Sequence, residues 1–144
     1  MKKIGIAADH AGYDLKEFFR KNFKDVEWMD FGPASADRVD YPDFAAKLCK
    51  AISDKKIEAG LLICGSGIGM SIAANKCDGI RAAHVESEIT ARLSKEHNNA
   101  NVLCIGSRIS APEYAIEILK SWLGATFQDG RHQDRIVKIH NLEK

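Results

Sequence analysis

The amino-acid sequence predicts an α/β fold, a three-layer α/β/α sandwich in which helices cover both faces of a five-stranded parallel sheet. Five short apolar runs alternate with amphipathic segments of helical length. Several runs lack the alternation of apolar and polar residues that a half-exposed strand would show, which favours strands buried on both faces. The length of 144 residues suits one domain. The predicted strands are 4–8, 26–31, 59–64, 80–85 and 102–105.

The first two helices have recognisable patterns and limits. Residues 14–23 repeat apolar side chains, including Leu15 and Phe19, at helical spacing beside charged residues. The second helix begins near Asp40 and continues to about residue 52. Pro42 occupies its first turn, where a missing N–H leaves no hydrogen bond unmade.

Three further helices complete the alternation, at 68–76, 87–97 and 111–123. Pro112 marks the start of the last one in the same way. After Gly124 the alternation ends, and the turn-forming residues 128–130 lead into a short polar helix that begins at Arg131. This C-terminal segment therefore needs a role other than building the sheet.

Composition and charge exclude several classes of function. Lys and Arg total 21 against 20 Asp and Glu, so a net charge of +1 provides no broad field for nucleic acid or an anionic membrane. The short apolar run near the N-terminus is too brief for a signal peptide or a membrane span, so we expect a cytoplasmic protein. Four irregularly spaced cysteines indicate neither a zinc site nor disulfides.

We expect one domain over 1–144, with a C-terminal arm of about 125–144.

Polar residues follow the predicted strands, where parallel α/β sheets bind their ligands. The first strand ends in Asp9-His10, the third in the segment 64–71, and the fifth in 106–108. The helix before the fifth strand ends in a fourth polar segment, 97–99. We expect these four segments to converge at one edge of the sheet.

The segment after the third strand spaces its glycines as G-x-G-x-G and then enters a helix. Backbone N–H groups in such a turn can point at an anion without interference from Cβ atoms. The spacing differs from the dinucleotide fingerprint, and the G-K-[ST] of a P-loop is absent. The pattern predicts an anion-binding loop, with a tight strand-to-helix connection as the alternative.

Cys64 is the last strand residue before this turn, where the start of the helix would stabilise a thiolate and lower its pKa. It is therefore a candidate base or nucleophile. The other three cysteines precede no glycine turn, so we expect them to serve packing.

His97 lies among asparagines that can orient an imidazole and bind hydroxyl groups, although the same residues also suit a helix end. Asp9-His10 has a helix-capping alternative of the same kind. For His84, His132 and His140 we expect structural or surface positions.

Arg131 and Arg135 are four residues apart, so on a helix they project from one face and can bind one dianion. A solvated surface helix is the alternative. In a protein with almost no net charge, such a pair would supply the local charge that phosphate binding needs.

Together these segments resemble the type B ribose-5-phosphate isomerases of the RpiB/LacAB sugar-phosphate isomerase family. The resemblance spans residues 2 to about 139, and its most specific part is the block 64–76. The motifs that carry it are Ala8-Asp9-His10-Ala11-Gly12, Asp40-Tyr41-Pro42, Cys64-Gly65-Ser66-Gly67-Ile68-Gly69-Met70-Ser71, His97-Asn98-Asn99-Ala100-Asn101 and Gly130-Arg131-His132. It implies a Rossmann-like form of the predicted fold.

The resemblance implies interconversion of ribose 5-phosphate and ribulose 5-phosphate through an enediolate, without metal or organic cofactor. Cys64 would move the proton between C1 and C2, and His97 would open the furanose ring. The developing oxyanion would meet the Ser66 hydroxyl and the loop amides of Gly65, Gly67, Ile68 and Gly69.

The same resemblance implies a set of substrate-binding residues. The sugar would contact Asp9, His10 and Asn98, the wall of the cleft would include Tyr41, and the phosphate would meet Arg108, Arg131 and Arg135. The family also implies a homodimer, or a dimer of dimers, with the active site at the subunit boundary and the C-terminal arginines reaching the partner.

Two positions place this chain within the family. Some members use a glutamate in the glycine-loop helix as the base, but here that position is Met70, which cannot accept a proton. Cys64 is thus the candidate base on this loop. Ser66 stands where many members have threonine and keeps the hydroxyl.

Two other functions remain open from the sequence. One is isomerisation of a six-carbon sugar phosphate, such as allose 6-phosphate or, as one subunit of two, galactose 6-phosphate. The other is a non-catalytic phosphate- or nucleotide-binding module, to which the glycine loop alone would be suited.

Overall fold

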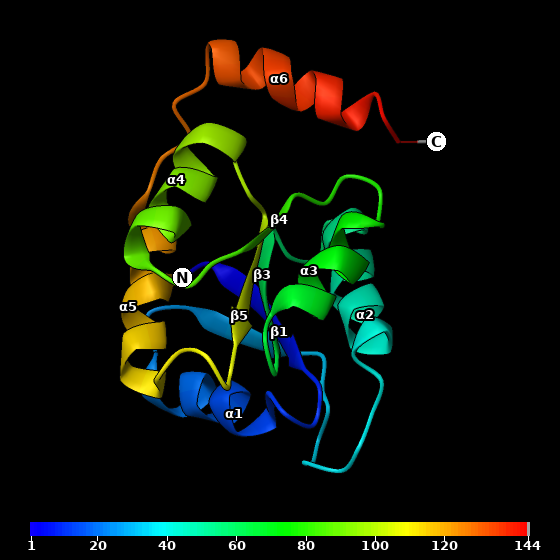
Figure 1. Ribbon diagram of the computed structural model, residues 1–144, viewed down its shortest axis with the longest axis vertical. Coiled ribbons are helices and arrows are strands. Elements are labelled where there is room, and N and C mark those ends of the chain that lie inside the picture. Colours follow the sequence, from blue (N-terminus) through cyan, green and yellow to red (C-terminus); the bar gives the residue numbers. More distant parts are fainter. Residues whose placement is uncertain (144) are drawn as a thin grey trace.

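The computed structural model describes residues 1–143, which contain five strands and six helices (Figure 1). The strands are β1 (Lys3–Ala8), β2 (Glu27–Asp30), β3 (Ala59–Cys64), β4 (Ala82–His84) and β5 (Val102–Gly106). The helices are α1 (Tyr13–Asn22), α2 (Tyr41–Ser53), α3 (Ile68–Asn75), α4 (Glu88–Asn98), α5 (Pro112–Gly124) and α6 (Arg131–His140). Every predicted element is present.

All five strands are parallel, in the order β2-β1-β3-β5-β4. The predicted three-layer, Rossmann-like α/β fold is therefore confirmed. α3 connects β3 to β4, which lies at the edge of the sheet beyond β5. α4 then connects β4 back to β5. Because parallel crossovers are right-handed, the direction of each step decides which face its helix covers. Figure 1 accordingly shows α2 and α3 on one side of the sheet, with α1, α4 and α5 on the other.

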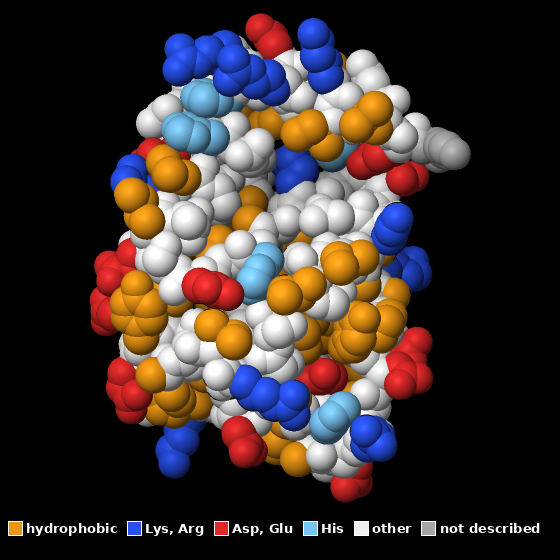
Figure 2. Space-filling view, viewed as in Figure 1, with side chains coloured by type: hydrophobic (Ala, Val, Ile, Leu, Met, Phe, Trp, Pro, Cys, Tyr) orange, Lys and Arg blue, Asp and Glu red, His pale blue; other side chains and the backbone are white. Residues whose placement is uncertain are grey.

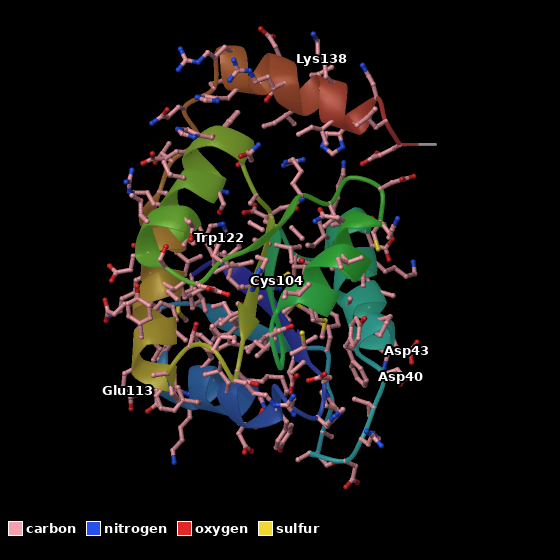
Figure 3. All side chains as sticks on the ribbon, viewed as in Figure 1. Asp40, Asp43, Cys104, Glu113, Trp122 and Lys138 are labelled. Carbon is pink, nitrogen blue, oxygen red and sulfur yellow. The ribbon has the colours of Figure 1, made fainter. Side chains whose placement is uncertain are left out.

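Each face of the sheet has its own hydrophobic core. One core joins β1, β3 and β5 to α1, α4 and α5, and includes Phe19 and Trp122, which are almost fully buried. The other lies beneath α2 and α3 and includes Leu48 and Met70. Figure 3 shows Trp122 and Cys104 in the interior of the molecule. Apart from the exposed Lys3 at the start of β1, the central strands are apolar, as suits strands whose two faces are both covered.

The edge strands are shorter than the sequence predicts. β2 covers four residues and β4 three, against six expected for each. Each edge strand pairs with only one neighbour, and the flanking Val26 and Ile80 lie outside the strands but stay buried in the cores.

The C-terminal segment leaves α5, runs along α4 and forms α6. The Gln128 N–H donates to the Glu96 carbonyl over 2.9 Å, and Ile136 is the one buried residue of α6. In Figure 1, α6 lies at the end of the molecule opposite the loop that leaves β5. Within residues 1–143, no helix combines the length and apolarity needed to cross a membrane.

Candidate active site

The first cluster of candidate residues lies at the carboxyl ends of β1, β3 and β5. The backbone of β5 and its loop holds the glycine loop, since Ser107 N–H donates to the Cys64 carbonyl over 2.9 Å and Arg108 N–H to the Gly65 carbonyl over 3.0 Å. The Ser107 hydroxyl also donates to the Ala11 carbonyl over 2.8 Å, which joins the β1 turn to the same cluster. We name as the thiol half-site the residues Asp9, His10, Tyr41, Cys64, Gly65, Ser66, Gly67, Ile68, Gly69 and Arg108.

The glycine loop directs a backbone N–H at the Cys64 thiol. Gly67 precedes α3 with φ of +82°, and its N–H donates to Cys64 Sγ over 3.1 Å. Cys64 is buried, so few other partners compete for the sulfur. Ser66 Oγ accepts the Ile68 N–H over 3.2 Å. A negative charge on Sγ would therefore meet a fixed donor at the positive end of α3.

Asp9 and His10 follow β1, and Tyr41 begins α2 beside the glycine loop. The buried Asp9 carboxylate accepts the Gly12 N–H over 2.9 Å and so stabilises the turn before α1, but it does not cap the helix, which has no side-chain cap. His10 Nδ1 lies 3.2 Å from the Val39 carbonyl oxygen. The Tyr41 ring is so close to Gly69 that a Cβ there would approach it to 2.6 Å. The ring therefore forms one wall beside the loop.

His84 is a contact residue of this half-site that the sequence analysis did not select. It ends β4, and its Nε2 donates to the Ser66 carbonyl over 2.9 Å. Its ring also fills the space beside Gly67, where a Cβ would lie 2.8 Å from His84 Cδ2. Its position at the carboxyl end of a strand could have indicated this role, because the same position indicates Asp9 and Cys64.

The expectation that His97 and Asn98 share an edge with Cys64 is wrong for a single chain. α4 ends at Asn98, and three residues later the Asn101 carbonyl accepts the Gly60 N–H near the start of β3. Cys64 is at the other end of β3. The five intervals between the six residues of β3, at about 3.3 Å each, place the two ends of the strand roughly 17 Å apart.

The physical reason is the direction of the helix. A helix that connects parallel strands runs back along the sheet, so its last residue lies at the amino edge. The rule for ligand binding at carboxyl ends applies to residues that follow strands, and His97 follows a helix.

At the amino edge, α4 and α6 form a second, cationic cluster. The rings of His97 and His132 stack with centroids 4.6 Å apart. Arg131 and Arg135 are exposed, and within residues 1–143 neither forms an ion pair. We name as the arginine half-site the residues His97, Asn98, Arg131, His132 and Arg135. Figure 2 shows Lys, Arg and His side chains gathered over the first part of α6.

The surroundings of His132 in the arginine half-site disfavour its protonation. Partial desolvation lowers the pKa of His132, and the neighbouring His97, Arg131 and Arg135 lower it further. The cluster thus remains cationic through its arginines while His132 tends to stay neutral. Such a surface attracts an anion.

The other buried thiols are poorly suited to chemistry. Burial and the neighbouring Cys77 raise the pKa of Cys49 to about 12, and burial raises the pKa of Cys104 well above its ordinary value. Within residues 1–143, no three His, Cys, Asp or Glu side chains are grouped as metal ligands would be.

We expect Cys49 and Cys104 to resist alkylation by iodoacetamide at pH 8. Cys49, with a pKa of about 12, is ionised there to only about one part in 10⁴, and burial raises the pKa of Cys104 as well. Mass spectrometry of tryptic peptides would measure the rate at each cysteine, with the half-buried Cys77 as the internal reference. Labelling of Cys49 as fast as that of Cys77 in the folded protein would contradict this expectation.

We expect Gly67→Ala to lower the free energy of unfolding more than Gly79→Ala does. Both glycines have φ near +80°, which costs an alanine on the order of 1–2 kcal/mol. A Cβ at Gly79 meets open space, whereas at Gly67 it would lie 2.9 Å from the Ile105 backbone. Urea unfolding of both variants separates the strain from the clash, and equal losses would show that the contact with β5 is unimportant.

The sequence of this chain is similar to those of known proteins. The model of the Ribose/Galactose Isomerase family matches residues 4–139. Ribose-5-phosphate isomerase B of Escherichia coli is 42% identical over 100% of this chain and 98% of its own length. D-erythrulose-4-phosphate isomerase of Pectobacterium atrosepticum is 39% identical, over 99% and 96%.

A solved structure extends the likeness to three dimensions. Ribose-5-phosphate isomerase B of Mycoplasma genitalium with bound ribulose-5-phosphate is 42% identical and superposes with a TM-score of 0.90, over 97% of this chain and 95% of that one. The family model and both full-length relatives lead to one conclusion: this chain belongs to the ribose/galactose isomerase family.

Proposed function

We propose that this protein is an aldose-ketose isomerase that interconverts ribose 5-phosphate and ribulose 5-phosphate in the cytoplasm, without metal or organic cofactor. The observation that carries the proposal is the Cys64 thiol, which accepts the Gly67 N–H over 3.1 Å at the start of α3. Membership of the family and the full-length relatives named above support the substrate class.

In the proposed reaction Cys64, as thiolate, removes the proton from C2 of the open-chain aldose. The electron pair of the C–H bond forms the C1–C2 double bond of the enediolate, while the electron pair of the C1 carbonyl moves onto O1. A proton then passes from O2 to O1, and the resulting thiol returns its own proton to C1 as the C2 carbonyl of the ketose forms. The Ser66 hydroxyl and the N–H groups of Gly65 to Gly69 stabilise the oxyanion, which is charged only after proton removal. Asp9 and His10 bind the sugar, and Tyr41 encloses it.

The arginine half-site supplies the remaining roles. His97 protonates the ring oxygen to open the furanose, Asn98 binds a hydroxyl group, and Arg131 and Arg135 bind the phosphate together with Arg108. Because His97 and Cys64 lie at opposite edges of one chain, both half-sites meet only if a second copy contributes one of them.

We therefore propose a homodimer, alone or paired into a tetramer, in which each active site combines the thiol half-site of one chain with the arginine half-site of its partner. Two-fold symmetry makes both sites equal. Exposed apolar side chains occur beside each half-site and suit burial in this interface. They are Ile68 and Ile72 on α3, and Val137 and Ile139 on α6.

Incubation with ribose 5-phosphate in D₂O, followed by NMR, tests the proposed function. We expect ribulose 5-phosphate to form with deuterium entering at C1 or C2, because a base that exchanges with solvent carries the proton. Parallel samples of allose 6-phosphate, galactose 6-phosphate and erythrulose 4-phosphate test the other sugar lengths. Binding of these sugars with neither product nor label would overturn the proposal and favour the non-catalytic module.

We expect Arg135→Ala to raise the KM for ribose 5-phosphate about 10- to 100-fold, since a hydrogen bond to a charged group contributes about 1.5–3 kcal/mol. The matched control is Lys138→Ala, which removes a charge from the same helix. Steady-state kinetics of both variants separate phosphate binding from general attraction, and equal effects would contradict a phosphate role for Arg135.

A further inference from the structure

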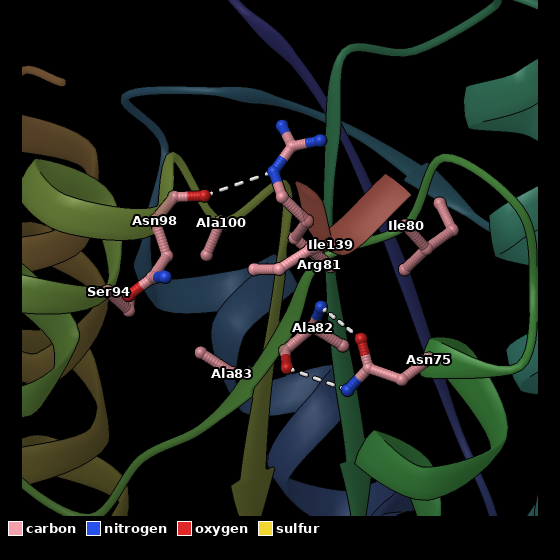
Figure 4. Close-up of a pocket in the computed structure, with 9 residues that line it drawn as sticks. All are labelled: Asn75, Ile80, Arg81, Ala82, Ala83, Ser94, Asn98, Ala100 and Ile139. Carbon is pink, nitrogen blue, oxygen red and sulfur yellow. Dashed lines mark hydrogen bonds between the residues drawn. The ribbon is translucent and has the colours of Figure 1, made fainter. Parts of the chain in front are cut away.

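α6 is held to the body of the protein by polar contacts more than by a core. A cavity of about 240 Å³ lies beneath it, lined by the ends of β4, α3 and α4 and by Ile139 of α6 (Figure 4). Ile136 is the only buried residue of the helix. The His97–His132 stack holds the first turn of α6, and one side chain on the wall of this cavity, Arg81, reaches its last residue.

Arg81 joins the end of α4 to the end of α6. Its Nε donates to the Asn98 carbonyl over 3.0 Å, as Figure 4 shows, and its Nη2 donates to the Asn99 carbonyl over 2.9 Å. Its Nη1 lies 2.7 Å from Nε2 of His140, the last residue of α6. The guanidinium thus binds the carbonyls at the negative end of α4, where a cation is favoured.

The contact with His140 fixes the state of that ring. A guanidinium only donates, so His140 Nε2 accepts and the proton of the neutral ring is on Nδ1. Nδ1 in turn donates to Glu143 Oε1 over 2.8 Å, and the same oxygen accepts the Gly79 N–H over 2.8 Å. The chain of contacts therefore continues from α6 to the turn between α3 and β4.

These contacts join the two helices that carry the arginine half-site. His97 and Asn98 are the last residues of α4, and Arg131 and Arg135 lie on the helix that His140 ends. Burial lowers the pKa of Arg81 and the nearby Glu143 opposes that shift. A desolvated guanidinium with all of its nitrogens committed to backbone and imidazole acceptors is suited to a fixed geometry.

We propose that Arg81 and His140 are positioning residues of the active site, which hold the end of α4 and α6 so that the arginine half-site meets the substrate on the partner subunit. The proposal rests on the proposed function, because the two residues act through His97, Asn98, Arg131 and Arg135. Arg81 serves both helices, whereas His140 serves α6 alone. Their substitutions therefore have different kinetic consequences.

The test compares His140→Leu, which loses the acceptor, with His140→Gln, whose side-chain oxygen can accept from Arg81 and whose amide can donate to Glu143. We expect His140→Leu to raise the KM for ribose 5-phosphate about tenfold with kcat changed less than about threefold, because the phosphate arginines lose their position. His140→Gln should restore KM to within about threefold of the unmodified protein. Arg81→Lys should lower kcat as well, since it releases His97 too.

Hydrogen exchange of the full-length protein supplies a readout that does not depend on activity. Amides of residues 131–140 should exchange about tenfold faster in His140→Leu and near the original rate in His140→Gln. Unchanged exchange in His140→Leu would overturn the proposal, and so would faster exchange with unchanged KM. If the unmodified protein isomerises no sugar phosphate, the proposed function fails, and the exchange rates still decide whether His140 holds α6.

Discussion

Replacing Cys64 with alanine is expected to abolish isomerisation while sugar-phosphate binding continues. If the thiolate carries the proton between C2 and C1, its loss removes the general base, and such groups contribute about 10²–10⁴-fold to rate. The decrease should fall on kcat. KM should change little, because the phosphate and hydroxyl contacts come from other residues. A coupled assay for ketose formation, with deuterium incorporation as the second measurement, would record both.

The variant should fold, which makes its loss of activity interpretable. Within the described residues, the one hydrogen bond of Cys64 Sγ is from the Gly67 N–H, so its removal leaves one loop donor unmet at a cost of about 1–3 kcal/mol. Cys77→Ala is the matched control, because it removes a half-buried thiol outside the half-sites and should keep full activity. Near-normal turnover by Cys64→Ala would exclude Cys64 as the base.

Much of the fold follows from the sequence because burial of both sheet faces leaves continuous apolar runs. Val102 to Ile105 is such a run, and the structure buries all of it. The order of the strands does not follow in the same way. No local sequence pattern predicts that the strand after α3 lies at the edge of the sheet, beyond β5. That position depends on how α2 and α3 pack together over one face.

The thiol half-site is predictable for a related reason. Strand ends are visible in the sequence, and parallel strands bring their ends to one edge, so Asp9, Cys64 and Arg108 could be placed together. His97 was assigned to the same edge although it ends a helix. Arg81 was not selected at all, because its partners Asn98 and His140 are 17 and 59 residues away along the chain. Contacts between residues so far apart along the chain produce no local sequence pattern.

The separation of the two half-sites is the chemical reason for proposing a dimer. A single chain has a thiol at one edge of the sheet and, at the other, the cations that we propose to bind phosphate. It therefore contains every group of the proposed reaction without the geometry for it. A second copy related by a two-fold axis would complete both active sites at once. This reasoning predicts how two inactive variants behave when they are combined.

A heterodimer of Cys64→Ala with His97→Asn is expected to recover half the activity of the unmodified dimer, although each variant alone is inactive. If each site uses Cys64 of one chain and His97 of the other, one site receives both defects and the other receives none. Co-expression with two different affinity tags isolates the heterodimer, and its kcat per dimer is the measurement. The opposite control pairs the unmodified chain with a chain that carries both substitutions. Shared sites then each receive one defect and activity disappears, whereas a site built within one chain would keep half of it.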